Sequence, residues 1–117
     1  MRCEGCKDLI VTIVNRGWAE EVIAASREAG AEGGTVLMGR GTGIHEKESI
    51  LGIPIEPEKE IVFTIVDLEQ TDRVLEAIVQ RLELERPGRG IAFVVTLGRI
   101  AGRPHRLGGG ERAGGEE

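Results

Sequence analysis

The sequence predicts an α+β domain in which a four-stranded antiparallel sheet carries two helices on one face. Three observations support this prediction. Strand-like and helix-like segments follow one another in the order βαββαβ, and the first half of this pattern recurs in the second half. The chain of 117 residues also has the length of one compact domain with a single core.

The repeat is a strand-like segment that returns fifty-two positions later. Val-Thr-Ile-Val-Asn at 11–15 recurs as Phe-Thr-Ile-Val-Asp at 63–67, and the same offset then relates Val22 to Val74. Each half therefore holds a strand, a short connection and the apolar stripe of a helix.

Four segments rich in Ile, Val and Thr are expected as strands, at 9–15, 35–40, 60–67 and 91–97. Both alternating faces of these strands carry apolar side chains. Because the two helices cover one face only, we expect the open face to pack against other copies of the chain.

The helices are predicted from apolar residues at helical spacing. In the first helix, Trp18, Val22, Ala25 and Ala29 share one face, and Gly30 is a suitable residue for the C′ position.

The second helix has its apolar stripe at Val74, Ile78 and Leu82, with Thr71 as the expected N-cap. Two β-α-β units in this order, joined by right-handed crossovers, form the ferredoxin-like split fold.

Composition divides the chain into three segments. We expect an N-terminal segment at 1–8 that carries a CxxC pair, the folded domain at 9–101, and a flexible Gly-rich tail at 102–117. The tail holds six glycines and one leucine, too little apolar surface to offset the entropy of ordering it unless a ligand or partner holds it.

Charge and hydropathy exclude several classes of function. The net charge is −5, and the chain has only two Phe, one Trp and no Tyr, so the basic surface and stacking platforms of a nucleic-acid binder are missing. No apolar run approaches the roughly 20 residues that span a bilayer, and the first residues lack the apolar stretch of a signal peptide. We expect a cytoplasmic protein without membrane insertion.

The longest connection, at 41–57, is the main candidate for a functional loop. Its seventeen residues exceed an ordinary connection, and it carries Ile50, Leu51, Ile53 and Ile55. Either it folds against its own or a neighbouring subunit, or it is a mobile element that docks on a partner. The candidate partner-binding residues are His45, Glu46, Lys47, Ser49 and Leu51.

Two glycine-containing segments, Arg40-Gly41-Thr42-Gly43 and Gly88-Arg89-Gly90, are candidate phosphate sites. Glycines let backbone N–H groups approach phosphate oxygens, and the arginines supply charge. The alternative is that these glycines serve turn geometry alone. Neither segment has the P-loop or dinucleotide pattern, and we expect both in loops near one edge of the sheet.

Cys3 and Cys6 form a lone CxxC pair, which is a weak metal signal because a structural zinc needs four ligands. Two inert thiols are the expected interpretation, and ligands shared between subunits are the alternative. No nucleophile, base and orienting group can be assigned together, so we expect no catalytic residues and no enzyme.

Together, these features resemble the PII signal-transduction family over roughly 9–100. The resemblance rests on Val-Thr-Ile-Val at 11–14, Ala-Gly-Ala-Glu-Gly-Gly-Thr-Val at 29–36, Arg-Gly-Thr-Gly at 40–43 and Gly-Arg-Gly-Ile-Ala-Phe-Val at 88–94. The segment from Gly43 to Pro57 is then similar to the family's T-loop, and that from Arg86 to Gly90 to its B-loop.

The resemblance implies a homotrimer that is not an enzyme and that binds ATP or ADP in clefts between subunits. The T-loop would control a partner, such as a membrane transporter or a regulatory enzyme, in nitrogen regulation. The implied ligand-binding residues are Arg40, Gly41, Thr42, Gly43, Gly88, Arg89, Gly90 and Arg103.

The sequence departs from the family pattern at several positions. Ile91 stands where the family places a phosphate-binding lysine, Ile44 or His45 where it places a glutamine, and only Arg103 and Arg106 approximate its C-terminal basic pair. Without tyrosine, the loop offers no uridylylation site. The alternatives within the same architecture are a CutA-like, metal-linked trimer and a structural trimer without a ligand.

Overall fold

The computed structural model describes residues 5–42, 48–50, 53–55 and 57–102. Its elements follow the predicted order, with one small hairpin added between the second and third predicted strands. They are β1 (Lys7–Asn15), α1 (Ala19–Glu28), β2 (Thr35–Arg40), β3 (Glu48–Ile50), β4 (Ile53–Ile55), β5 (Glu58–Asp67), a 3₁₀ turn (Leu68–Gln70), α2 (Thr71–Leu82) and β6 (Ile91–Leu97).

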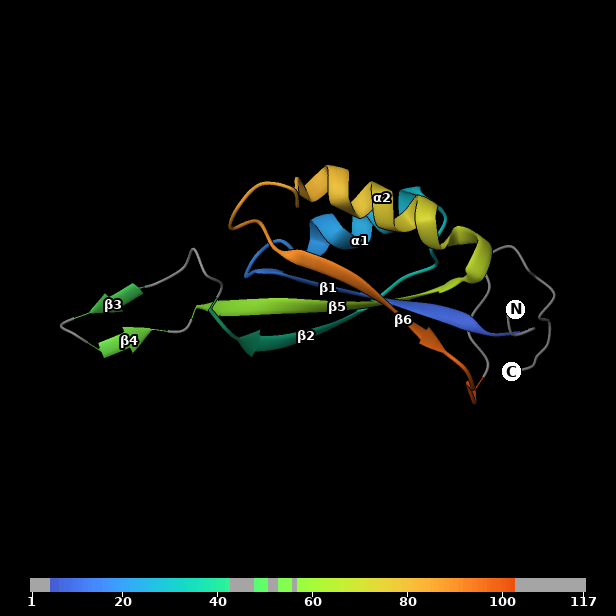
Figure 1. Cartoon of the computed structure of the whole chain (residues 1–117), viewed down its shortest axis with the longest axis horizontal. Coiled ribbons are helices and arrows are strands. Elements are labelled where there is room, and N and C mark those ends of the chain that lie inside the picture. The colour runs from blue at the N-terminus through green and yellow to red at the C-terminus, as the bar shows by residue number, and fades with distance from the viewer. Residues whose placement is uncertain (1–4, 43–47, 51–52, 56, 103–117) are drawn as a thin grey trace.

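The main sheet has the strand order β2-β5-β1-β6, with every neighbouring pair antiparallel. Figure 1 shows both helices on the same face of this sheet, while the other face is uncovered. The prediction of a ferredoxin-like fold is therefore confirmed. β3 and β4 form a separate two-stranded hairpin that stands beyond one end of the sheet.

The two repeated segments become the two central strands, where they pair with each other. Val11 lies opposite Phe63, and Ile13 lies opposite Ile61. Because the side chains of a strand alternate between the two faces, this register places the residues of each pair on one face.

The core lies between the helix-covered face of the sheet and the two helices. Residues at every second position of β1 and β5 meet the predicted stripes of α1 and α2, and each of these side chains is at most 2% exposed. They are Ile10, Val14, Val62, Val66, Val22, Val74, Ile78 and Leu82. The predicted stripe of α2 is thereby confirmed.

The uncovered face is apolar across three strands. Val11 in β1 lies between Phe63 of β5 and Phe93 of β6, which are 37% and 42% exposed. Ile65 and Val95 extend the apolar surface on either side of β1 and are similarly exposed. This face has the composition of a surface that is normally buried.

Two expected helix details are wrong. Trp18 precedes α1 instead of lying on its buried stripe, and it is 38% exposed. Thr71 is the first residue of α2 and not its N-cap, because the chain enters the helix through the 3₁₀ turn and Gln70 is already in αR conformation. Gly30 does follow α1 at positive φ (117°), as predicted for C′.

Candidate functional site

The long loop leaves and re-enters the sheet at one end, where the termini of four strands meet. It departs from β2 and returns at β5, and its root is closed by the Gly41 N–H, which donates to the Pro57 carbonyl at 3.2 Å. The C-terminal end of β1 and the N-terminal end of β6 lie at the same end of the sheet. This end therefore gathers both glycine-containing segments and the root of the long loop (Figure 1).

A hollow of about 510 Å³ lies at the loop root and is lined by Arg16, Met38, Gly39, Arg40 and Glu58. Inside it, Arg16 Nη1 donates to Glu58 Oε1 at 2.8 Å. Arg40 is the register partner of Glu58 on the neighbouring strand, so both side chains lie on the same face of the sheet. A single carboxylate thus faces two guanidinium groups.

This hollow is on the helix-covered side of the sheet end. Glu58 has the same parity in β5 as Glu60 and Val62, and Val62 is buried beneath the helices. Glu60 Oε1 accepts a hydrogen bond from the backbone N–H of Ala19, the first residue of α1, at 2.8 Å.

On the opposite side of the sheet end, a polar chain links β5, β1 and the loop before β6. Lys59 Nζ donates to Asn15 Oδ1 at 2.6 Å, and Asn15 Nδ2 is 3.5 Å from the Gly88 carbonyl oxygen. Lys59 and Asn15 are register partners, which explains their contact. These contacts attach the loop before β6 to the same strand ends that hold the long loop.

The loop before β6 requires glycine at its last position. Gly90 has a φ of 136°, and a Cβ built on it would lie 2.6 Å from the Ile13 carbonyl oxygen. A side chain is therefore excluded by backbone atoms of β1. Gly88, at a φ of 79°, has open space around it, so only its conformation favours glycine.

Arg89 is held by the helix layer of its own chain. Its Nε donates to the carbonyl of Leu82 at the C-terminal end of α2, at 3.0 Å, and its guanidinium carbon is 4.7 Å from the centre of the Trp18 ring. The side chain therefore satisfies a helix-end carbonyl and makes a cation–π contact. This explains why Trp18 is placed outside the core stripe.

The two glycine-containing segments occupy opposite edges of the sheet, not one edge as expected. β2 and β6 are the edge strands, separated by β5 and β1. Three strand spacings correspond to about 14 Å. Within one chain, Gly41 and Gly88 therefore share an end of the sheet but not an edge.

The predicted site residues divide into those that the structure describes and those that it does not. Arg40, Gly41 and Thr42 lie at the loop root, and Gly88, Arg89 and Gly90 lie before β6. Ser49 falls within β3. The remaining candidates, Gly43, His45, Glu46, Lys47, Leu51 and Arg103, are outside the described residues, as are Ile44 and the Gly-rich tail after Gly102.

Sequence reasoning missed Arg16, Glu58, Asn15 and Lys59. These residues contact one another across more than forty positions of sequence, so no local motif marks them. The one available signal is that both pairs flank the ends of predicted strands.

The CxxC segment is only partly described. Cys6 is 7% exposed and disulfide-bonded, which corrects the expectation of an inert free thiol, and its Sγ is 3.5 Å from the Gly98 carbonyl oxygen. Cys3 lies outside the described residues. Among the residues that the structure describes, no three His, Cys, Asp or Glu side chains gather as a metal site.

The protein is a small α+β domain in which the root of a long loop and two glycine-containing segments lie at the same end of the sheet. A family model described as nitrogen regulatory protein P-II matches residues 7–102. The chain therefore belongs to the P-II family, whose members are regulators and not enzymes. This confirms the family resemblance seen in the sequence.

Solved structures support the same fold. PII of Arabidopsis thaliana bound to citrate is 21% identical, with 76% of this chain and 72% of that chain covered and a TM-score of 0.58. GlnK of B. subtilis is 18% identical, with 80% and 86% covered and a TM-score of 0.61. No curated protein matches the chain. In the described part of the chain, no helix is both long and apolar enough to cross a membrane.

Proposed function

We propose that this protein is a cytoplasmic PII-like signalling protein that binds an adenine nucleotide between subunits and controls a partner through the loop at 41–57. The observation that carries the proposal is the position of the two glycine-containing segments. They lie at the same end of the sheet as the loop root, but on opposite edge strands. A ligand held there is next to the element that would signal its presence.

The chemistry of this end suits a polyanion. Among the described residues that line the hollow, Arg16 and Arg40 flank one carboxylate, that of Glu58, so the charge of the lining side chains is positive in a chain whose net charge is negative. A Cβ on Gly41 would meet no atom within 4 Å, so the space beside this residue is open, while its N–H is already bonded to the Pro57 carbonyl. One arginine guanidinium can donate two parallel hydrogen bonds to phosphate oxygens, and backbone N–H groups can donate further ones.

The separation of the two segments favours a site between subunits. One phosphate group is far smaller than about 14 Å, so two segments that grip the same phosphate group would have to come from different copies of the chain. The apolar uncovered face supplies a surface for association, and we propose a homotrimer, as the resemblance to the PII family implies. The Arabidopsis relative was solved with citrate, a small polyanion.

Arg89 takes a different role in this proposal from that of a primary phosphate ligand. Its Nε is already engaged by Leu82, and its ring contact fixes it against Trp18. Arg89 thus fixes the shape of the loop that presents the amides of Gly88 and Gly90, with its terminal N–H groups left for a ligand. Arg40 supplies the primary charge.

The loop at 41–57 is the proposed partner-binding element. Its β3–β4 hairpin stands away from the sheet end, separated from the core of the domain (Figure 1). A target of the kind controlled by the family, a transporter or a regulatory enzyme in nitrogen regulation, would contact this hairpin and its flanking residues. The metal-linked, CutA-like alternative has no support of this kind, because the family match is to P-II.

Calorimetric titration tests the proposal. Purified protein of known mass in solution is titrated with ATP, ADP, AMP, cyclic nucleotides and bicarbonate, each with and without magnesium. We expect saturable binding of an adenine nucleotide near one site per subunit, and at least tenfold weaker binding for Arg40→Gln, since it removes a charge-assisted hydrogen bond of about 1.5–3 kcal/mol.

Arg27→Gln is the matched control, because Arg27 is an exposed arginine at the end of α1, away from the sheet end. It should bind as the unmodified chain does. A folded trimer that is silent towards every nucleotide, or an Arg40→Gln variant equal to the control, would contradict the proposed site.

A further inference from the structure

In the hollow, the guanidinium of Arg16 is bonded to the carboxylate of Glu58 and is therefore not available to a ligand. The two side chains are 69% and 52% exposed and meet at 2.8 Å within the hollow that Arg40 also lines. With the pair closed, Arg40 is the one guanidinium of the hollow with no carboxylate bonded to it in the described part of the chain. With the pair open, there are two.

The pair can open without loss of the strand contact behind it. The backbone N–H of Arg16 donates separately to the carbonyl oxygen of Glu58 at 3.3 Å, and Arg40 remains the register partner of Glu58. The side chains are therefore free to separate while β1, β2 and β5 keep their positions.

The energetics favour exchange with a phosphate. Exposed ion pairs are weak, since ordering two long side chains and screening by salt offset most of the attraction. A phosphate group carries more charge than a carboxylate and accepts the arginine fork through several oxygens. A phosphate group can also contact Arg40 at the same time. Without it, Glu58 is the one carboxylate in the described lining of the hollow that offsets the charge of both arginines.

We infer that Arg16 is a phosphate-binding residue and that Glu58 is a built-in competitor, which an incoming polyphosphate displaces from Arg16. This rests on the proposed function, since it assumes an anionic effector at this end of the sheet. Competition from Glu58 thereby lowers the affinity of the hollow for anions, so that only a ligand with several negative charges displaces Glu58 from Arg16.

The test uses tripolyphosphate as the probe, in calorimetric titrations at low and moderate salt with the full chain and ATP in parallel. Glu58→Gln frees Arg16 and should tighten tripolyphosphate binding about two- to fivefold, the range expected for release of an exposed ion pair. Arg16→Gln should weaken it by at least as much. In the double variant, the gain from Glu58→Gln should disappear.

Glu21→Gln provides a closely matched control. Glu21 pairs with Arg81 at 2.9 Å between the two helices and is 49% exposed. Arg81 also pairs with Glu28 at 3.3 Å, so the variant removes one exposed carboxylate without leaving its arginine unpaired. It measures the effect of net charge alone. Thermal unfolding of each variant confirms that it is folded.

The outcomes separate this inference from the proposed function. If ATP and tripolyphosphate bind but Glu58→Gln matches Glu21→Gln, Glu58 does not compete and the inference is overturned while the proposed function stands. If neither anion binds the folded chain, both are overturned. A gain in Glu58→Gln that persists without Arg16 would assign the effect to Arg40 and also overturn the inference.

Discussion

Two buried hydroxyl groups are the least satisfied residues of the core. Thr12 in β1 and Thr64 in β5 are fully buried on the helix-covered face, and neither Oγ1 has a hydrogen-bond partner among the described residues. Burying a hydroxyl without a partner costs free energy that a methyl group of the same shape avoids. At both positions threonine has the β-branched shape that suits a strand, but its buried hydroxyl lowers the stability of the fold.

Thr12→Val should therefore raise the free energy of unfolding by about 0.5–2 kcal/mol, measured by urea denaturation. Thr96→Val, at an exposed position of β6, is the control and should change it by less than about 0.5 kcal/mol. A clear loss of stability in Thr12→Val would mean that its hydroxyl has a partner in the native protein.

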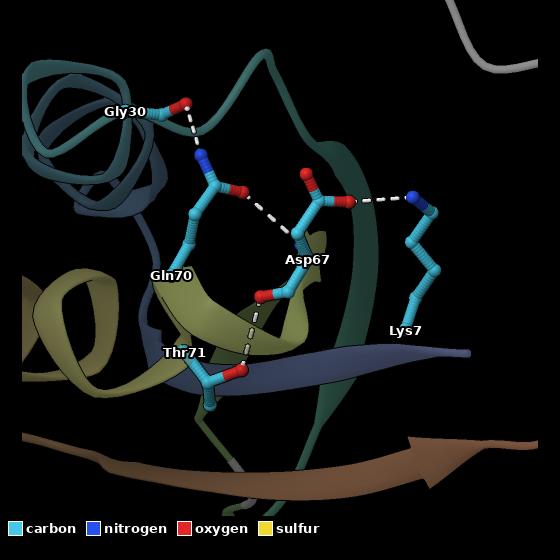
Figure 2. Close-up of polar contacts among 5 residues, drawn as sticks. All are labelled: Lys7, Gly30, Asp67, Gln70 and Thr71. Carbon is cyan, nitrogen blue, oxygen red and sulfur yellow. Dashed lines mark hydrogen bonds and ion pairs between the residues drawn. The ribbon is translucent and has the colours of Figure 1, made fainter. Parts of the chain in front are cut away.

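At the scale of elements, the start of α2 is held by a compact polar network. Gln70 Oε1 accepts from the backbone N–H of Asp67 at 3.0 Å, and its Nε2 donates to the carbonyl of Gly30 at 3.1 Å (Figure 2). Asp67 also pairs with Lys7 at the start of β1. One side chain thus links the end of α1, the end of β5 and the start of α2.

Gln70→Ala should lower the free energy of unfolding by about 1–2 kcal/mol, because two backbone groups lose their partner. The comparison variant is Gln80→Ala, since Gln80 is exposed and its side chain donates to Glu76 one turn away. Its cost should be about 0.2–0.5 kcal/mol. Equal losses in the two variants, measured by chemical denaturation, would show that the network does not secure the helix.

The elements also show what sequence can and cannot predict here. The strands and helices followed from periodicity and from the repeat, because apolar spacing reflects which face is buried. Trp18 was misassigned since its spacing fits the stripe although the helix begins one residue later. The Arg16–Glu58 pair could not be predicted, because it forms only when two distant strand ends meet.

At the scale of the whole molecule, the uncovered face of the sheet should decide assembly. Phe93→Lys places a charge in the middle of β6, beside Val11 on the apolar face formed by β5, β1 and β6, where its burial between subunits would be costly. We expect the variant to sediment as a monomer with an intact helical signal, because the core lies on the other face. Thr96→Lys, on the same strand with opposite parity, should retain the oligomer. An unchanged mass for Phe93→Lys would place the interface elsewhere.

The contact between Trp18 and Arg89 gives the protein an optical property as well as a structural one. Trp18 is the chain's only tryptophan, and it lies against the loop whose amides would meet the ligand. Any displacement of that arginine changes the surroundings of a single indole, without interference from tyrosine. The intrinsic fluorescence of the unlabelled protein is therefore a site-specific reporter of events at this end of the sheet.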